Sequence, residues 1–271
     1  MGQKEIGPAS ECLAAEEAGT DQQSLLGVTS QSNDSTTCHA VKGARQNATT
    51  DAERLLHAIH GDSDGWAYLW LKEGGLPQGE KGKSTTLWFR PGQPLPTLPT
   101  GKWDVYFGVN LNDVKRGDKQ RALIDTVGCI GTLYAEVDGP RTLDDLLAHF
   151  AQRGVPTPSA TVFSGGGFHC YWLLTETITL DDHNRLDVRA IQHAWVHFAG
   201  GDPGATCITR VLRVPGTVNH KPARNGAKVE LVTLDTDLRH DLTDLADLLG
   251  VERIVASRQQ LAFATAREVH P

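Results

Sequence analysis

The sequence predicts an α+β fold, with an RRM-like (split βαβ) core over residues 130–250 and an N-terminal α/β module over residues 51–129. After residue 130, strand-like and helical segments follow one another as β-α-β-β-α-β, which is the split βαβ order. Before it, one amphipathic helix and three strand-like runs are separated by glycine- and proline-rich segments. The 271 residues are enough to bury a substantial core.

The N-terminal module begins with a short amphipathic helix near Asp51, and Gly61 closes it. Alternating or clustered apolar residues predict three strands, at 66–72, 85–89 and 103–109. A loop at 74–83 separates the first two strands. The segment 91–101 contains four prolines, which indicates a crossover before the third strand.

In the core, the same patterns predict strands at 130–137, 160–163, 168–174 and 228–234. They predict helices at 143–152, 182–198 and 242–249, with Thr142 as the cap of the first. In the split βαβ topology the first and third strands are neighbours. Glu136 and Asp138 are two residues apart on the first strand and share a face, while His169 opens the third, so these side chains can meet on one sheet surface.

Composition limits the compartment and the broad class of the protein. A net charge of −7 argues against a protein that coats DNA. The five cysteines are widely spaced and never form a CxxC pair, so neither a disulfide framework nor a cysteine-type zinc site is supported. No apolar run approaches the roughly 18 residues that span a bilayer. We therefore expect a cytoplasmic protein without a membrane partner.

The two ends differ from the rest of the chain. Residues 1–50 are rich in polar and small residues, with few aromatic or β-branched clusters, and are predicted to form a disordered leader. Residues 251–271 are assigned as a tail.

A turn-rich basic arm spans residues 201–221. Between Gly201 and Glu230 five bases face two acids, Asp202 and Glu230, which gives a local charge of +3. The bases are Arg210, Arg213, Lys221, Arg224 and Lys228. Because arginine presents a planar fork to phosphate, an anionic ligand is expected here. Asp202, at the start of the arm, could hold a metal ion.

Two other segments carry complementary chemistry. The carboxylates of Glu136 and Asp138 suit Mg²⁺ or Mn²⁺, ions that usually complete their shell with substrate phosphates. Glycines 165–167 let backbone N–H groups approach a phosphate just before His169. With the basic arm, these segments predict a site for a metal-bound nucleotide.

Each segment also has a purely structural interpretation. The acidic pair precedes Gly139-Pro140, an ordinary turn sequence. The three glycines alone would suit a hairpin loop, and His169 a packed position. Arg210 and Arg213 would suit surface ion pairs. The occurrence of all of them, in this order on one predicted fold, favours the nucleotide site.

Three strings carry a resemblance to a known family: YAEVDG at 134–139, SGGGFHCYWLL at 164–174, and GGD at 200–202 followed by RVLRVPGTVNHK at 210–221. In this order they resemble the three motifs of the archaeo-eukaryotic primase superfamily, especially the primase-polymerases of plasmids, phages and integrated elements. VYFGVN, at 105–110, is similar to the entry strand of that group. The resemblance covers roughly residues 51–250.

The resemblance implies an RRM-like catalytic core and a template-directed nucleotidyltransferase, a DNA primase/polymerase that uses two Mg²⁺ or Mn²⁺ ions in the replication of such an element. It implies a single-stranded DNA template, dNTP or NTP, and a replicative helicase as partners. The positions that match the metal-binding and catalytic acids are Glu136, Asp138 and Asp202. The positions that match nucleotide-binding residues are Ser164, His169, Arg210, Arg213 and Lys221.

The sequence departs from the family pattern at three positions. Glu136 stands where aspartate is commoner, Gly167 where many members have serine, and Asp202 lies on no obvious strand. Two other functions stay open. A non-catalytic RRM-like binding module would carry an RNP1 string, which this sequence lacks. A replication-initiator nuclease would need paired histidines and a nearby tyrosine, whereas His169 has no partner histidine beside it.

Overall fold

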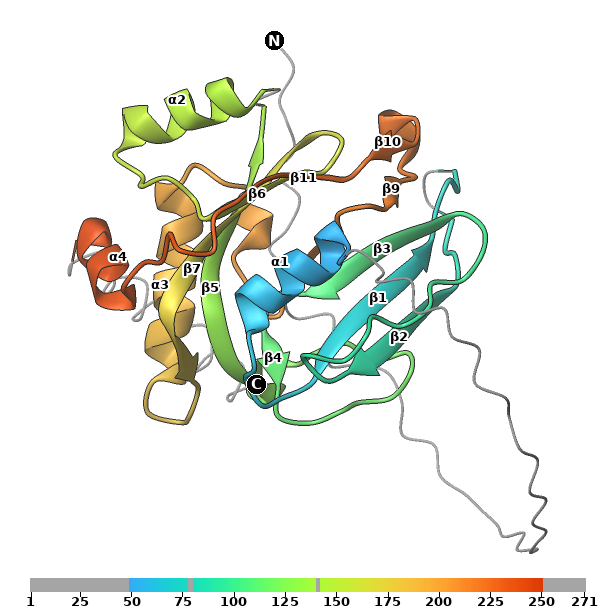
Figure 1. Ribbon diagram of the computed structural model, residues 1–271, viewed down its shortest axis with the longest axis horizontal. Coiled ribbons are helices and arrows are strands. Elements are labelled where there is room, and N and C mark those ends of the chain that lie inside the picture. The colour runs from blue at the N-terminus through green and yellow to red at the C-terminus, as the bar shows by residue number, and fades with distance from the viewer. Residues whose placement is uncertain (1–48, 78–79, 140–141, 251–271) are drawn as a thin grey trace, which may run out of the picture. The chain divides into compact units, whose positions relative to one another are not determined.

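Two antiparallel sheets organise the computed structural model, which describes residues 49–77, 80–139 and 142–250 (Figure 1). The larger sheet has five strands in the order β11-β6-β7-β5-β4, and the smaller has four in the order β2-β1-β3-β8. The bounds in the larger sheet are β4 Leu111–Asn112, β5 Val127–Asp138, β6 Ala160–Phe163, β7 Gly167–Thr179 and β11 Glu230–Leu234. Those in the smaller sheet are β1 Ala67–Glu73, β2 Ser84–Phe89, β3 Trp103–Gly108 and β8 Val211–Arg213. Two short strands, β9 Val218–Asn219 and β10 Ala227–Lys228, pair with each other.

Side-chain caps stabilise the starts of the first two helices. The helices are α1 Asp51–His60, α2 Leu143–Arg153, α3 Arg185–Phe198 and α4 Leu242–Leu249. Thr50 and Glu53 form a capping box at α1, and Thr142 and Asp145 form one at α2. The cap predicted at Thr142 is therefore present, since the threonine oxygen accepts from an otherwise unpaired N–H.

The strand pair β5–β7 is buried on both faces. On one face, Trp172 of β7 meets Trp195 of α3 edge to face, with ring centroids 5.0 Å apart. On the other face, Tyr171 stacks on Phe107 of β3 at 6.3 Å. Because successive strand residues point to opposite faces, one strand serves both cores. Figure 1 accordingly shows α3 and α4 on one side of β5 and β7, and the smaller sheet on the other.

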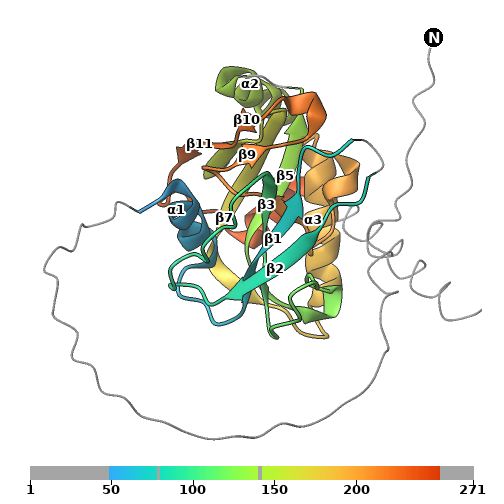
Figure 2. The same cartoon turned by 90° about the vertical axis from the view of Figure 1, so that its right-hand side faces the viewer.

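Helix α1 lies on the side of β7 opposite to α3 (Figure 2). It packs against β5, β7 and β11, and Leu55 and Ile59 are buried there. The larger sheet is thus enclosed by helices and by the smaller sheet, and polar side chains gather where β5 ends.

All predicted helices and strands are present, and their bounds differ from the predicted ones by at most five residues, at the end of β7. The short strands β4 and β8 were not predicted. Two and three residues are too few to show an alternating pattern. The strand β8 matters most, because it adds an element from the C-terminal half of the chain to the N-terminal sheet.

The mixed α/β class is as predicted, but the strand order is not that of an RRM. The element order β5-α2-β6-β7-α3-β11 is present, and β5 and β7 are neighbours. In the split βαβ fold the fourth strand lies beside the first. Here β4 occupies that edge of β5, and β11 pairs with β6 instead.

The predicted leader lies outside the described residues except for Thr49 and Thr50, and the predicted tail at 251–271 lies wholly outside them. Across the ranges that the structure describes, none of the helices combines the length and the apolar character needed to cross a membrane.

Candidate active site

Glu136 and His169 face each other near the end of the central strand pair. Glu136 lies in β5 and His169 in β7, and the strand register pairs the two residues directly. Both lie on the face that carries Tyr134 and Tyr171, toward the smaller sheet. Glu136 Oε2 and His169 Nε2 are 4.0 Å apart. The strand order thus brings together a carboxylate and an imidazole that are 33 residues apart in the numbering of the chain.

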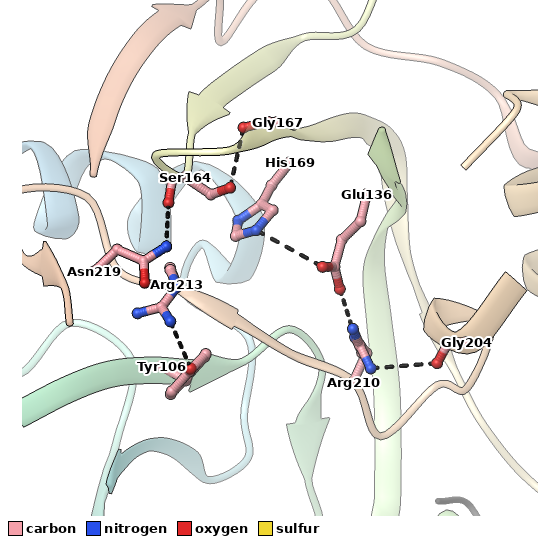
Figure 3. A network of polar contacts seen from close by, with 9 residues as sticks. All are labelled: Tyr106, Glu136, Ser164, Gly167, His169, Gly204, Arg210, Arg213 and Asn219. Atoms are coloured by element: carbon pink, nitrogen blue, oxygen red, sulfur yellow. Dashed lines mark hydrogen bonds and ion pairs between the residues drawn. The ribbon is translucent and has the colours of Figure 1, made fainter. Parts of the chain in front are cut away.

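Arg210 binds the same carboxylate from the loop before β8. Its Nε donates to Glu136 Oε1 at 2.5 Å, and its Nη1 donates to the carbonyl of Gly204 at 3.2 Å (Figure 3). The two side chains of the ion pair are 24% and 22% exposed. Because water competes for both charges, an ion pair of this kind contributes little and opens at low cost. Both side chains of this ion pair are partly accessible to solvent.

Asp202 reaches β5 through its backbone. Its N–H donates to the carbonyl of Glu136 at 2.8 Å, and its carboxylate accepts from the N–H of Gly204 at 2.9 Å. Gly201 permits this approach, since a Cβ there would lie 2.9 Å from the Glu136 carbonyl oxygen. The close approach of the two backbones therefore explains why a glycine precedes Asp202. Asp138 is exposed at the end of β5.

The glycine-rich turn between β6 and β7 is closed by Ser164. Its N–H and its Oγ both donate to the carbonyl of Gly167, at 2.9 and 3.0 Å. The side-chain amide of Asn219 donates to the carbonyl of Ser164 at 2.7 Å (Figure 3). A Cβ on Gly167 would lie 2.5 Å from the carbonyl oxygen of Val137. The turn therefore needs glycine, and the Ser164 hydroxyl holds the turn.

Arg213 is buried in a polar network. Its Nη1 donates to Asp104 at 2.6 Å, and its Nη2 donates to the hydroxyl of Tyr106 at 2.8 Å. Asp104 also accepts from the N–H of His220 at 2.8 Å. The Arg213 and Asp104 side chains are only 4% and 8% exposed. The network thus ties β3 to β8 and to the basic arm, and it directs the guanidinium toward protein groups.

The surroundings of His169 are electropositive. The pKa of His169 is lowered to about 4, chiefly by burial; Glu136 raises it, and the charges of Arg213, Arg210 and Lys221 contribute to the lowering. His169 is therefore neutral at pH 7. Its buried Nδ1 has no hydrogen-bond partner among the described residues. Three bases around a neutral imidazole with an unused nitrogen suit an anionic ligand.

The three carboxylates have the chemistry that a divalent ion needs, and their backbones lie close together, but the side chains of Glu136 and Asp202 point to different partners. Glu136, Asp138 and Asp202 supply the oxygen ligands that Mg²⁺ and Mn²⁺ prefer. Their side chains do not converge: within the residues that the structure describes, no group of three His, Cys, Asp or Glu side chains could hold a metal ion. Glu136 is bound to Arg210, and Asp202 accepts from Gly204. Metal binding would thus require Glu136 to release Arg210.

Several residues of the site were not predicted to belong to it. Asn219 orients the glycine-rich turn, and the Arg224 guanidinium lies against the turn, 2.1 Å from where a Gly166 Cβ would be. Asp104 and Tyr106 hold Arg213. The sequence did contain a signal for Asp104, because an acidic residue inside an apolar strand indicates that it has a buried partner.

Comparisons of sequence find no relatives. No family model matches the chain, and no curated protein matches it either.

Comparison of structures finds primases. The AEP domain of the cyanophage S-2L primase-polymerase (PrimPol) is similar with a TM-score of 0.53 and 16% sequence identity, over 72% of this chain and 95% of that one. A crystal structure of primase RepB′ has a TM-score of 0.45 and 12% identity, over 81% of this chain and 69% of that one. The catalytic domain of RepB′ with initiator DNA has a TM-score of 0.44 and 13% identity, over 78% of this chain and 100% of that one. The last two scores are too low to support a conclusion. The first confirms, at the level of the fold, the resemblance that the three motifs predicted: the chain has an archaeo-eukaryotic primase-type fold.

Proposed function

We propose that this protein is a metal-dependent, template-directed nucleotidyltransferase, a DNA primase/polymerase acting in the replication of a plasmid, phage or integrated element. The observation that supports this most is the grouping of Glu136, Arg210 and neutral His169 at one strand end of a primase-type fold. A single-stranded DNA template and dNTP or NTP are the substrates, and a replicative helicase is the expected partner.

Glu136, Asp138 and Asp202 would hold two Mg²⁺ or Mn²⁺ ions. When bound, such ions activate the attacking 3′ hydroxyl and neutralise the leaving pyrophosphate. The chain fixes the acids in different ways. Glu136 and Asp138 are fixed by β5, and Asp202 by its backbone hydrogen bond to Glu136. The larger sheet with its helices, within residues 130–250, acts as the catalytic core in this proposal.

The nucleotide phosphates would lie among His169, Arg210 and Lys221. Arg210 exchanges Glu136 for a phosphate oxygen, and its planar fork suits that contact. The unused Nδ1 of His169 supplies a further hydrogen-bonding atom. Because His169 is neutral, it adds no charge that would repel a metal ion nearby.

Ser164 and Arg213 act as positioning residues. Ser164 closes the turn that carries Gly165 and Gly166, whose N–H groups would approach a phosphate. Arg213 contacts Asp104 and Tyr106 and so holds the arm that leads to Lys221. Direct phosphate binding by Arg213, expected from the motif, would require that buried network to open.

The test is incorporation of labelled dNTP or NTP on single-stranded DNA with Mn²⁺ or Mg²⁺, with and without a primer. Asp138→Ala should abolish incorporation and leave the thermal stability nearly unchanged, because Asp138 is exposed at a strand end. Glu176→Ala, which removes an exposed carboxylate elsewhere on β7, is the matched control and should incorporate normally.

Two outcomes would contradict the proposal. Extension by Asp138→Ala at the wild-type rate would remove the metal assignment. A wild-type protein that binds oligonucleotides and incorporates nothing would be a binding module.

A further inference from the structure

Cationic and aromatic side chains lie together on the face of the smaller sheet that points away from Phe107. Trp70 of β1 pairs with Tyr106 of β3 in the strand register, and their rings are 5.3 Å apart. The guanidinium of Arg121 lies 4.6 Å over the Trp70 ring, and that of Arg213 lies 4.7 Å over the Tyr106 ring. Arg121, Trp70, Tyr106 and Arg213 therefore form one continuous series.

A basic loop lies beside this series. Residues 115–121, KRGDKQR, contain four bases and one acid, which gives a net charge of +3. The loop is fixed to β2, since Thr86 N–H donates to the carbonyl of Asp118 at 2.5 Å and Trp88 Nε1 donates to that of Gly117 at 3.4 Å. Lys115, whose ammonium lies 5.6 Å over the Trp66 ring, is exposed, as is Arg121.

The series leads to the candidate active site. Arg213, its last member, is buried and donates to Asp104, which also accepts from the N–H of His220. The neighbouring Asn219 donates to Ser164 in the glycine-rich turn, and Figure 3 draws this contact beside His169. A ligand on the exposed part of the series would therefore extend toward the nucleotide site.

We propose that the basic loop 115–121, with Trp70 and Tyr106, binds single-stranded DNA and guides the template into the active site; this rests on the proposed function. The loop supplies cations for the phosphates, and the exposed Arg121 guanidinium and the partly exposed rings supply contacts for bases. Duplex DNA presents the same phosphates but keeps its base faces covered, so the aromatic half of this surface favours single strands.

The test measures the anisotropy of a fluorescent 20-mer of dT, and of an abasic 20-mer with the same backbone, at several salt concentrations. Arg121→Ala should weaken dT binding about tenfold. The slope of log K against log salt concentration should become less negative by roughly 0.7 for each phosphate that is no longer neutralised. Trp70→Ala should weaken binding of dT and leave the abasic strand unaffected. Arg54→Ala, which removes an exposed arginine from α1, is the control for charge and should bind as wild type.

Thermal unfolding of each variant separates a binding defect from a folding defect, and exposed Arg121 keeps the test valid if Trp70→Ala is unstable. Wild-type affinity in Arg121→Ala and Trp70→Ala, with nucleotide incorporation by the wild type intact, would overturn the DNA path and leave the proposed function standing. Equal binding of duplex and single strands, with no effect of Trp70→Ala, would also overturn it. A wild type that neither binds DNA nor incorporates nucleotide would refute the proposed function itself.

Discussion

Two arginine–carboxylate pairs lie on either side of the candidate active site, and they differ in exposure. Arg210 and Glu136 are each about a quarter exposed, whereas Arg213 and Asp104 are 4% and 8% exposed. Asp104 also accepts from the N–H of His220, and Arg213 also bonds to Tyr106. The first pair is partly accessible to solvent, and the second is buried within a network.

The difference shows that similar residues can have opposite roles within one motif. Arg210 and Arg213 are three positions apart in the chain. Arg213 lies in β8, whose pairing with β3 places it beside Tyr106 and Asp104. Arg210 lies before the strand and reaches the end of β5 instead. The boundary of a three-residue strand thus separates a proposed ligand-exchanging arginine from a structural one.

The largest effect is expected from breaking the buried pair. Arg213→Ala would leave Asp104 buried without its charge partner, a change that typically costs about 3–5 kcal/mol. Chemical denaturation should show this destabilisation, and replacing both residues, Asp104→Leu with Arg213→Met, should recover part of it. A stable Arg213→Ala protein with a raised Michaelis constant for nucleotide would instead make Arg213 a direct ligand.

The next effect concerns pH. Burial lowers the pKa of both His60 and His169 to about 4, below the ordinary 6.5. A depressed histidine pKa adds stability that is fully present above about pH 6.5 and lost as the pH falls toward 4. The loss is roughly 3 kcal/mol per histidine. His169→Gln should therefore reduce the acid sensitivity of the melting temperature, and a pH profile identical to wild type would contradict the burial of a neutral His169.

The smallest change in stability is expected from the partly accessible pair. Arg210→Ala should alter the free energy of unfolding by at most about 1 kcal/mol. Since it frees Glu136, it should tighten Mn²⁺ binding, measured by calorimetry without nucleotide, by about tenfold. Arg153→Ala, on α2, is the matched control. Weaker Mn²⁺ binding in Arg210→Ala would show that the arginine does not compete with metal for Glu136.

The sequence predicted the parts of the site that depend on strands. Runs of apolar residues located β5, β6 and β7, and the neighbouring positions of β5 and β7 explain why Glu136 and His169 meet. Glycine positions were also informative, because Gly167 and Gly201 each lie where a Cβ would strike a backbone oxygen.

The other contacts of the site depend on pairings between distant segments, which the sequence does not reveal. Nothing in the string around Arg213 reveals Asp104, which is 109 positions away in the chain. Ser164 was expected to bind a ligand, but its turn is tight enough for the hydroxyl to bond to Gly167. The sheet order was missed because the two residues of β4 carry no periodic signal and yet occupy the free edge of β5.

The hydrogen bond between Arg213 and Asp104 also bears on when the site forms during folding. Closing a long loop costs chain entropy, so contacts between distant segments tend to form later than local ones. The bond from Arg210 to Glu136 likewise spans 74 positions. A nascent chain that has emerged only as far as β7 would therefore hold Glu136 and His169 without either arginine. Its end of β5 would carry the Glu136 carboxylate without a cationic partner. Under the proposed function, affinity for nucleotide would therefore appear late, when β8 pairs with β3.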